Sequence, residues 1–574
     1  MSKKIIRRVY EKEWLSECHA TLHPLIRRIY TARGIRSMQE LERGLDHLLP
    51  FHTLSGINEA VIHLAEAIFQ QQKILVIGDF DADGATSTAV AVRALRWFGL
   101  KKVDYLVPNR FDFGYGLTPE LVEVAKSLDP ALIVTVDNGI ANHAGVMAAK
   151  ALGIKVIITD HHLPAETLPI ADAIVNPNQP GDRFQSKNMA GVGVIFYVML
   201  ALRRHLSDQH WFEKQAIPSP NMAHLLDLVA LGTVADVVPL DHNNRILVYQ
   251  GLKRICAEQC VPGISALLAV SQRHQRHVQA SDLGFSVAPR LNAAGRLDDM
   301  SLGIECLLTE DKVHALELAE QLNQLNDARR DIEKTMQEQA LHALANIHWQ
   351  GVTPDAICLF DEEWHQGVIG ILAGRIKDRL HRPVIVFAPS KGDELKGSAR
   401  SIPGLHIRDV LAEVAAHHPN MMNKFGGHAM AAGLTLSRSV LTHFAEVFRQ
   451  VAASKLTNLD LQNALHSDGE LQPDELTLDM ADLLCDAGPW GQGFPSPLFD
   501  GVFELVEQRL VVNKHLRLSL KKGNDVVTAI AFNVDINQWP NYRCHSVQLA
   551  YRVDRNEFRG KRQLQLIVEY IKAI

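Results

Sequence analysis

The chain has 574 residues, 47% hydrophobic and 22% charged, a composition typical of a folded globular protein and not of a disordered one. The net charge of −6 excludes a uniformly basic nucleic-acid coat, although residues 501–574 hold 12 Lys and Arg against 7 Asp and Glu and could hold a polyanion. Because no apolar run is long enough to cross a membrane and the first residues are charged, we expect a cytoplasmic protein without a signal peptide.

Residues 1–70 have amphipathic helical patterning without a chemical motif, and we expect them to form a helical cap. From residue 73 onward, apolar strands alternate with helices. Strands that are apolar on both faces and alternate with helices indicate a parallel sheet covered on both sides. We therefore predict a parallel α/β domain over residues 71–303. Its expected strands are 74–78, 103–107, 131–136 and 154–159, and its expected helices are 85–98, 118–127 and 140–152.

An acidic run follows the first of these strands, in the sequence GDFDADG. Asp79, Asp81 and Asp83 alternate, so an extended backbone would point all three carboxylates to one side. Their repulsion would raise their pKa values unless a cation lay among them, and no Lys or Arg occurs between Lys73 and Arg93. A bound metal ion is the simplest source of the missing charge. The alternative is a solvated acidic turn in which Asp83 is the N-cap of the next helix.

Two further strands of the predicted sheet end in residues that bind metals. Asp137 follows the third strand, and Asp160, His161 and His162 follow the fourth. Sites in parallel sheets form beyond the carboxyl ends of the strands, which lie at one edge. Three such strand ends on one edge favour a shared metal site over three unrelated turns.

A fourth acidic position lies in the apolar segment LLDLVALGTVADVVPL. Burying Asp236 there would be costly unless it had a partner, and the metal cluster is the partner available. Asp227 in the same segment is expected to be a hydrogen-bonded core residue and not a ligand. Asp and His without Cys suit Mn²⁺ or Mg²⁺, and so many carboxylates suggest two ions. Paired ions activate water in phosphoryl hydrolysis, which predicts a phosphodiesterase or phosphatase.

The rest of the chain divides into three parts. Residues 304–350 contain no Gly or Pro and have apolar residues at helical spacing, which predicts one long connecting helix. Residues 351–460 resemble a second, smaller α/β unit. Residues 461–574 begin with a turn-rich linker and continue as five alternating strands with basic residues, which are compatible with an OB-type β-barrel that binds single strands.

The motifs D-x-D-x-D, D-x-G and D-H-H, with the later Asp236, resemble the four motifs of the DHH phosphoesterase superfamily. The strings VPNRFDFGYGLTPE, PRLNAAGRLDDMS, EWHQGVIGILAGRIK and KFGGHAMAAG extend the resemblance along the whole chain, to the bacterial single-strand-specific exonucleases of that superfamily. The resemblance implies a parallel-sheet DHH domain, a DHHA1-type substrate-binding domain and an OB-type barrel. It also implies that two divalent ions, Mn²⁺ or Mg²⁺, are held by Asp79, Asp81, Asp83, Asp137, His161 and Asp236.

The resemblance implies roles for further residues. His162 would face the scissile phosphate, and Asp160 would orient the histidine pair. Other residues would contact the DNA or its terminal phosphate, although without the family Tyr115 would be a half-buried loop residue and the glycine pair a tight turn. These predicted contacts are Arg110, Tyr115, Arg290, Asn292, Arg296, Ser398, Arg400, Gly426, Gly427 and His428.

The resulting prediction is a metal-dependent exonuclease that degrades single-stranded DNA from its 5′ end to mononucleotides, in DNA repair and recombination. Expected partners are single-stranded DNA with a 5′ end, single-stranded-DNA-binding protein and a RecQ-type helicase, with no membrane and a monomeric enzyme. Two alternatives remain. An enzyme for pyrophosphate or very short oligonucleotides would need neither the long helix nor the basic barrel, and a non-enzymatic DNA-binding scaffold would not need a full ligand set.

Overall fold

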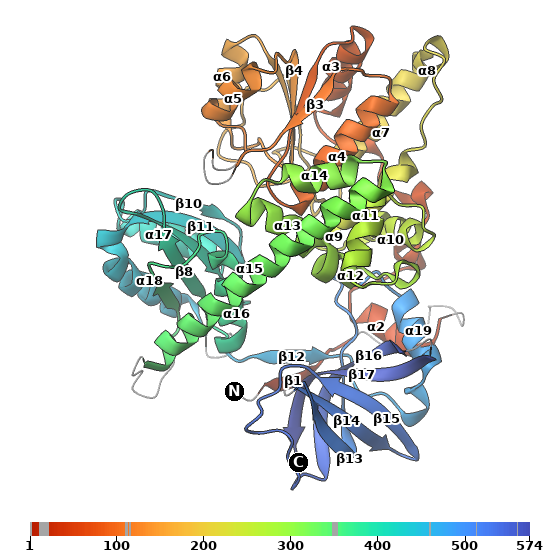
Figure 1. Cartoon of the computed structure of the whole chain (residues 1–574), viewed down its shortest axis with the longest axis vertical. Helices are drawn as coiled ribbons and strands as arrows, with labels where there is room; N and C mark the ends of the chain where they lie inside the picture. The colour runs from red at the N-terminus through yellow and green to blue at the C-terminus, as the bar shows by residue number, and fades with distance from the viewer. Residues whose placement is uncertain are drawn as a thin grey trace. The chain divides into compact units, whose positions relative to one another are not determined.

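The structure is a computed structural model, which describes residues 3–10, 22–109, 113, 116–346, 354–457, 461–512, 514–558 and 561–574 (Figure 1). The chain forms two compact units. One consists of Met1–Ile6 and Asp327–His466, and the other of Arg7–Asn326 and Ser467–Ile574. The predicted parallel sheet, second α/β sheet and closed barrel are all present, which confirms the predicted fold class.

The parallel sheet lies in the larger unit and has the strand order β3-β2-β4-β5-β6, with every neighbouring pair parallel. The sequence predicted the first four strands to within one residue at each end but did not predict β6. The strands are β2 (Ile74–Ile77), β3 (Val103–Leu106), β4 (Leu132–Val136), β5 (Lys155–Thr159) and β6 (Ala173–Val175).

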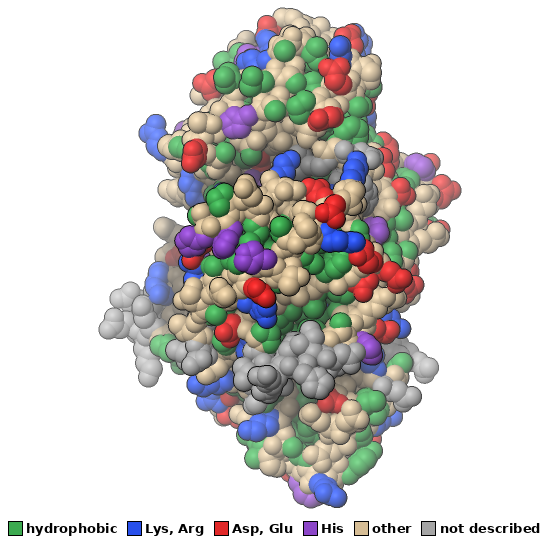
Figure 2. All heavy atoms as spheres, turned by 90° about the vertical axis from the view of Figure 1, so that its left-hand side faces the viewer, with side chains coloured by type: hydrophobic (Ala, Val, Ile, Leu, Met, Phe, Trp, Pro, Cys, Tyr) green, Lys and Arg blue, Asp and Glu red, His purple; other side chains and the backbone are tan. Residues whose placement is uncertain are grey.

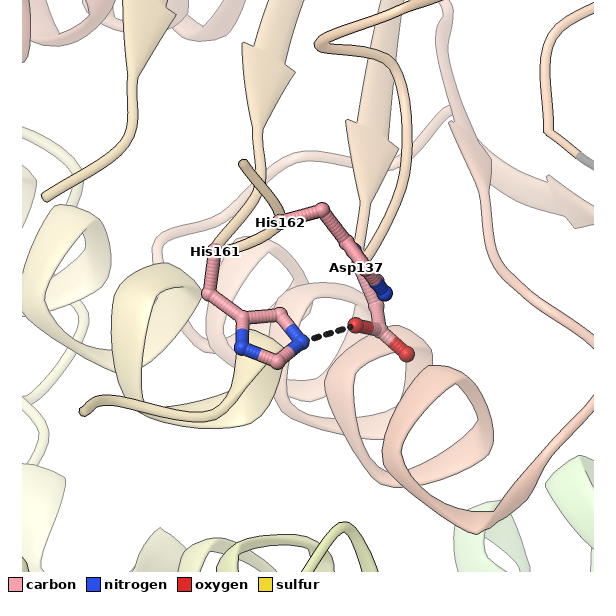
Figure 3. Close-up of side chains that lie close together, drawn as sticks. All are labelled: Asp137, His161 and His162. Atoms are coloured by element: carbon pink, nitrogen blue, oxygen red, sulfur yellow. Dashed lines mark ion pairs between the residues drawn. The ribbon is translucent and has the colours of Figure 1, made fainter. Parts of the chain in front are cut away.

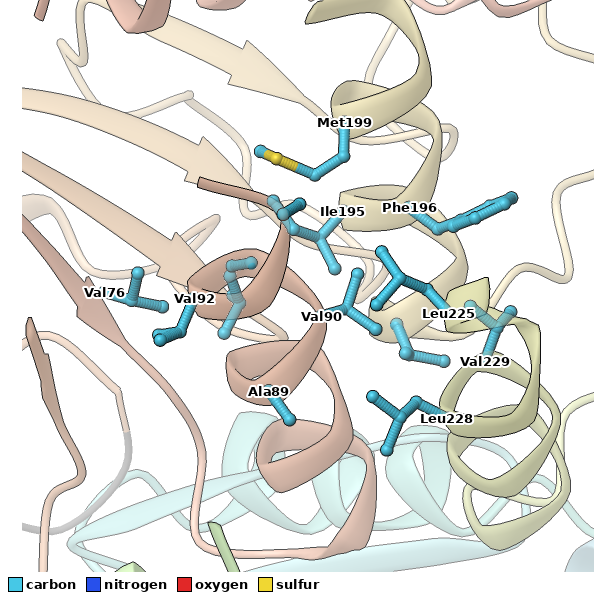
Figure 4. Close-up of a cluster of buried hydrophobic side chains, with 14 of the residues drawn as sticks. Val76, Ala89, Val90, Val92, Ile195, Phe196, Met199, Leu225, Leu228 and Val229 are labelled. Carbon is cyan, nitrogen blue, oxygen red and sulfur yellow. The ribbon is translucent and has the colours of Figure 1, made fainter. Parts of the chain in front are cut away.

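Helices cover both faces of this sheet because its strands are apolar on both sides. Along β2, Leu75 and Ile77 belong to a core with α5 (Pro119–Lys126) and α6 (His143–Ala151). Ile74 and Val76 belong to the opposite core, which also contains side chains of the helices on that side. In that core, residues of three helices interdigitate, as Figure 4 shows around Val90. The helices on that side are α3 (Ile57–Phe69), α4 (Ala82–Trp97), α7 (Gly191–Asp208) and α9 (Leu226–Ala235).

The larger unit contains further helices and a π-helical turn. A π-helical turn, Leu283–Val287, runs directly into α13. The other helices are α2 (Pro24–Thr31), α8 (Trp211–Lys214), α10 (His242–Cys256), α11 (Pro262–Val270), α12 (Ala280–Asp282), α13 (Ala288–Leu297) and α14 (Ser301–Leu308). The N-terminal segment is less helical than predicted, because β1 (Lys4–Arg7) pairs with β12 (Ala464–Ser467). A strand partner distant in sequence overrides the local pattern here.

The predicted long helix is interrupted near its start. Its first residues belong to α14, and Thr309 has an extended backbone with ψ of 142°. Asp311 then accepts a hydrogen bond from the backbone N–H of Val313 at 2.8 Å and caps α15 (Lys312–Asn346). The long helix therefore begins at residue 312 and not at 304.

The smaller unit contains a mixed sheet in the order β10-β11-β9-β8-β7, in which only the pair β7 and β8 is parallel among the described residues. Glu333 of α15 forms ion pairs with Arg329 at 2.9 Å and with Arg375 at 2.8 Å. The elements are β7 (Ile357–Phe360), α16 (Ile369–Leu380), β8 (Val384–Pro389), β9 (Glu394–Arg400), α17 (Ile407–His417), β10 (Lys424–Gly427), β11 (Ala431–Ser437) and α18 (Leu441–Lys455).

The C-terminal strands close into a barrel in the order β13-β14-β15-β17-β16, with β15 and β17 parallel. Its elements are α19 (Leu478–Asp486), β13 (Phe499–Val511), β14 (His515–Lys522), β15 (Asp525–Ala531), β16 (Ser546–Phe558) and β17 (Lys561–Ala573). Arg33, just after α2, forms an ion pair with Asp468 at 2.8 Å and lies over the ring of Trp490. The N-terminal segment therefore binds the residues that precede the first barrel strand, β13. Among the described helices, none combines the length and the apolar character that a bilayer crossing requires.

Candidate metal centre

The metal-binding motifs meet at one edge of the parallel sheet. Strands β2, β4 and β5 are neighbours, with Ile77 paired to Thr135 and Val136 paired to Thr159. The loops that follow these strand ends therefore begin side by side, as expected for a parallel sheet. They carry the residues of the D-x-D-x-D, D-x-G and D-H-H motifs.

In the first motif, Asp81 caps a helix and Asp83 is buried. Asp81 is the N-cap of α4 and accepts hydrogen bonds from the backbone N–H groups of Asp83 at 2.9 Å and Gly84 at 3.0 Å. Asp83 is 1% exposed, and its carboxylate accepts N–H groups of Gly191 at 2.7 Å and Val192 at 2.9 Å. These donors form the first turn of α7, where the helix dipole favours an anion. The alternative of a solvated turn capped by Asp83 is therefore wrong.

Asp137 and Asp236, from two of the other motifs, lie close to the imidazole of His161 in the D-H-H motif. The Nε2 atom of His161 lies 3.1 Å from Oδ1 of Asp137 (Figure 3). The same atom lies 3.4 Å from Oδ2 of Asp236, which directly follows α9. Asp137 has a φ of 62°, a left-handed conformation that Asp tolerates better than most residues, and this turns its chain directly after β4. Asp236 and His161 lie 75 positions apart in the sequence, so the fold and not the local motif brings them together.

His162 forms a tight pair with Asp160. Its Nδ1 atom lies 2.7 Å from Oδ1 of Asp160, which also accepts the backbone N–H of His161 at 2.7 Å. Burial alone would lower the pKa of His162, but the charge and hydrogen bond of Asp160 raise it to about 9. Burial alone would raise the pKa of Asp160, but the charge and hydrogen bond of His162 lower it to about 2. His162 is therefore a cation at neutral pH that Asp160 holds in a fixed orientation.

The pKa values of the neighbouring groups shift in the opposite directions: those of the carboxyl groups are raised and that of His161 is lowered. Burial raises the pKa of Asp83 to about 7, with the charge of Asp236 adding to the rise. Burial and then the charge of Asp81 raise the pKa of Asp236 to about 7. Burial and the nearby carboxylates raise the pKa of Asp137 well above its ordinary value. Burial and the charge of His162 lower the pKa of His161, which favours the neutral imidazole that binds metals.

The carboxylates and His161 fit two divalent ions. The ligand atoms of Asp79, Asp81 and Asp137 lie within 4.8 Å of one another, and a second group with the same spacing contains Asp83, His161 and Asp236. These two groups share no residue and together contain all six predicted ligands. A further group joins Asp137, His161 and His162. Burial and the repulsion among these carboxylates raise their pKa values, and a bound cation would offset both effects.

Several supporting residues were not identified from the sequence. A Cβ atom on Gly191 would lie 2.6 Å from the Cβ of Asp137, so only glycine fits between Asp83 and Asp137. The amide of Asn178 donates to the carbonyl of His161 at 2.6 Å, and that of Asn176 to the carbonyl of His162 at 2.9 Å. Both asparagines follow β6. The sequence VNPN after an apolar run, a fourth strand end on the same edge, was the available signal.

The residues of PRLNAAGR support the site from α13. The side-chain oxygen of Asn292 accepts the backbone N–H of Ala82 at 2.8 Å, which ties α13 to the first motif. Arg290 is 7% exposed and donates to the side chain of Asn323 at 2.9 Å and to the carbonyl of Ser286 at 2.5 Å. The phosphate contact of Arg290 stays a prediction. Arg296 is half-buried in the last turn of α13. The predicted contacts Arg110 and Tyr115 lie outside the described residues.

A second candidate site lies within the smaller unit. Ser398 and Arg400 are two positions apart on β9, and a guanidinium N–H of Arg400 donates to the Ser398 hydroxyl at 3.1 Å. A Cβ on Gly370 would lie 2.9 Å from that guanidinium and 3.0 Å from the hydroxyl, so the first turn of α16 lies directly beside the pair. An arginine, a hydroxyl and a helix N-terminus together suit a phosphate.

The predicted glycine motif is in the same sheet. Gly426 and Gly427 belong to β10, at the edge, and His428 is exposed in the turn that follows. Gly426 pairs with Gly433 of β11, which in turn pairs with Ser398 of β9. The structure therefore places the two predicted phosphate-binding motifs of this unit on β9 and β10, which lie on either side of β11 in the same sheet.

Basic charge on the barrel is partly neutralised. Asp482 of α19 pairs with Arg555 at 2.9 Å and with Arg562 at 2.5 Å, and Arg552 pairs with Glu569 at 3.3 Å. Lys514 remains exposed. In Figure 2, basic and acidic side chains are interspersed over the face shown. Phosphate binding is therefore expected from individually placed residues and not from a uniformly basic surface.

Three family models match the chain. They are the DHH family N-terminal domain over residues 73–233, the DHHA1 domain over residues 353–454 and the RecJ OB domain over residues 467–570.

Full-length relatives and solved structures agree with these matches. The chain is 53% identical to the single-stranded-DNA-specific exonuclease RecJ of Escherichia coli, with 100% of both chains covered. It is 32% identical to RecJ of Bacillus subtilis, with 97% of this chain and 69% of that protein covered. The crystal structure of RecJ in complex with Mn²⁺ from Thermus thermophilus aligns with a TM-score of 0.81 at 29% identity, covering 100% of this chain and 79% of that one. The corresponding Mg²⁺ complex aligns with a TM-score of 0.75.

Proposed function

The chain belongs to the RecJ family of single-stranded-DNA-specific exonucleases, and we propose that it removes mononucleotides from the 5′ end by hydrolysis at the cluster of Asp79, Asp81, Asp83, Asp137, His161 and Asp236. It is a metal-dependent exonuclease that uses Mn²⁺ or Mg²⁺. The observation that carries the assignment to these residues is that the six predicted ligands fall into two groups with metal-binding spacing.

In this proposal Asp79, Asp81 and Asp137 hold one ion, and Asp83, His161 and Asp236 hold the other. The bound ions supply an acidified water and positive charge near the phosphate oxygens. His162 has its Nδ1 atom paired with Asp160, so the N–H of its other ring nitrogen would donate a hydrogen bond to a phosphate oxygen, whose negative charge grows during attack. Neutral His161 remains a ligand while its neighbour carries the charge.

The smaller unit would bind the terminal phosphate. Ser398 and Arg400 offer a hydroxyl and a guanidinium beside the first turn of α16, and the edge strand β10 offers glycine backbone. Recognition of a terminal phosphate at a fixed site would set which end of the strand enters first and would make the enzyme act from the 5′ end. The OB barrel would hold the single strand beyond the site.

DNA labelled at one end tests the reaction and its direction. We expect Mn²⁺ or Mg²⁺ to support immediate release of labelled mononucleotides from 5′-labelled single strands, late release from 3′-labelled strands, and little release from blunt duplex. Asp137→Ala should abolish hydrolysis while leaving DNA binding largely intact. Full hydrolysis by this variant would refute the metal centre. Hydrolysis of pyrophosphate or dinucleotides alone would support a small-substrate enzyme, and binding without cleavage would support a scaffold.

We further propose that the enzyme acts as a monomer with two protein partners, single-stranded-DNA-binding protein and a RecQ-type helicase. The substrate supports this proposal, because an exonuclease specific for single strands needs unwound ends that remain accessible. Immobilised chain should retain both proteins in the absence of DNA. Retention of neither would contradict the partners, and light scattering that gives a dimer mass would contradict the monomer.

A further inference from the structure

Three exposed apolar side chains belong to segments of the larger unit that carry a metal ligand or pack beside one that does. Leu163 directly follows His162 and is 52% exposed, and Val237 directly follows Asp236 and is 63% exposed. Phe285 is 81% exposed, although Leu283 and Val287 in the same turn are fully buried. We call Leu163, Val237 and Phe285 the apolar collar. Its members come from three different segments of the chain.

Phe285 belongs to the same part of the molecule as the metal ligands. It lies in the π-helical turn Leu283–Val287, and a Cβ on the preceding Gly284 would lie 3.2 Å from the side chain of Val234, two residues before Asp236. The turn continues into α13, where Asn292 binds the backbone of the first motif at 2.8 Å. Seven helical residues separate Phe285 from Asn292, a rise of about 10 Å. π-helical turns of this kind occur frequently at functional sites.

Exposed apolar side chains next to a centre for phosphate chemistry need a chemical explanation. A phosphate or a metal ion gains nothing from a leucine, a valine or a phenylalanine, whereas a nucleobase has an apolar face that stacks on aromatic rings. Single-stranded DNA, the substrate in the proposed function, exposes the faces of its bases. Stacking also reads no particular base, which suits an exonuclease that must accept every nucleotide.

On the basis of the proposed function, we propose that the apolar collar binds the unpaired bases of single-stranded DNA close to the cleaved phosphate, with Phe285 as the stacking platform. In a duplex only the outer face of the terminal pair is open and both faces of every inner base are covered, so a base beyond the first could stack on Phe285 only after its pair had opened. The collar would therefore contribute to single-strand specificity at the site of cleavage, separately from the OB barrel. Phe285 is a binding and specificity residue here and takes no part in the chemical step.

The test compares normal and abasic DNA. Fluorescence anisotropy in metal-free buffer would measure binding of a 5′-phosphorylated oligodeoxynucleotide and of the same strand with one abasic residue at each of its first positions in turn. We expect Phe285→Ala to weaken binding of the normal strand roughly tenfold or more, the range for one lost base stack. At one abasic position the wild-type protein should show the same loss, and the variant should show no further loss. Phe285→Trp should bind as the wild type does.

Ile170→Ala is the matched control. Ile170 is also apolar and 74% exposed, but Asp172 close to it binds the backbone N–H of Val156 at the start of β5, the opposite edge of the sheet from the metal centre. This variant should bind both DNAs normally. Melting temperatures of all three variants near that of the wild type would show that each is folded.

Two results would overturn the proposal. Binding of normal DNA by Phe285→Ala as tight as binding by the wild type would show that the collar does not bind bases and would favour a protein partner for it. Alternatively, the variant could lose the same factor with every abasic strand, which would mean a structural role. Because binding is measured without metal, the test is independent of hydrolysis. A wild-type protein that binds DNA but cleaves neither labelled strand would refute the proposed function and not the collar.

Discussion

Gly191→Ala should disable the metal centre without changing any ligand. The added Cβ would lie 2.6 Å from the Cβ of Asp137, 2.7 Å from its Oδ1 and 2.8 Å from its Cγ. Ordinary contacts between carbon atoms are about 3.5 to 4 Å, so Asp137 and the first turn of α7 must separate by about 1 Å. That turn also donates the N–H groups of residues 191 and 192 to Asp83, at 2.7 and 2.9 Å. One substitution therefore displaces a residue of each ligand group.

The expected magnitude follows from those contacts. A hydrogen bond to a charged group contributes about 1.5 to 3 kcal/mol, and mutation of partners that orient metal ligands typically weakens metal affinity by about 10- to 100-fold. Calorimetric titration of the metal-free protein with Mn²⁺ should show a loss in that range. Exonuclease activity measured against Mn²⁺ concentration should shift to higher concentration by a similar factor.

Gly193→Ala is the control on the same helix. Its Cβ would meet the terminal methyl of Met189 at 3.1 Å, and a flexible methionine end moves more easily than a carboxylate fixed in a left-handed turn. This variant should keep wild-type Mn²⁺ affinity. The reasoning about Gly191 would be refuted if Gly191→Ala bound Mn²⁺ with unchanged affinity and degraded single strands at the wild-type rate.

Three further outcomes are expected. Asp160→Asn removes the charge that raises the pKa of His162 to about 9. The fall in kcat at alkaline pH, measured at saturating Mn²⁺, should therefore move to lower pH. An unchanged pH profile would exclude His162 as the titrating group. Metal-free protein should lose stability as pH rises from about 4 to about 7, because Asp83 and Asp236 keep their protons to higher pH in the folded protein than in the unfolded chain. In a thermal scan, Mn²⁺ should therefore raise the Tm more at pH 8 than at pH 5. Asn292→Ala removes the acceptor for the N–H of Ala82, and urea unfolding should show a loss of about 1 to 2 kcal/mol together with weaker Mn²⁺ binding.

The parallel sheet could be predicted closely because its signals are local and strong. The strand runs ILVI and LIVTV are apolar on both faces, which few other structures require, and the carboxyl ends of parallel strands must share an edge. Asp79, Asp137 and Asp160 could be placed together on that argument alone. Asp236 required a further step, the cost of burying a lone carboxylate, and it does lie 3.4 Å from His161.

Features that depend on tertiary contacts could not be predicted in this way. The pairing of β1 with β12 joins segments over 450 residues apart, and nothing in KIIR distinguishes a strand from a helical turn. The break before α15 depends on one extended residue, Thr309, in a stretch without Gly or Pro. An arginine in PRLNAAGR has the same appearance in sequence whether or not it is buried, so the hydrogen bonds of Arg290 to Asn323 and Ser286 could not be predicted.

The environment of Asp83 shows why the centre is completed by cations and not by the protein alone. Two N–H groups at the positive end of α7 already bind its carboxylate, and such bonds lower a pKa. Its pKa is nevertheless raised to about 7, because burial and the charge of Asp236 outweigh them. Burial and the charges of neighbouring carboxylates raise the pKa values of Asp137 and Asp236 as well. The fold therefore fixes the positions of the carboxylates but leaves their charge uncompensated, which couples the stability of this sheet edge to divalent ions.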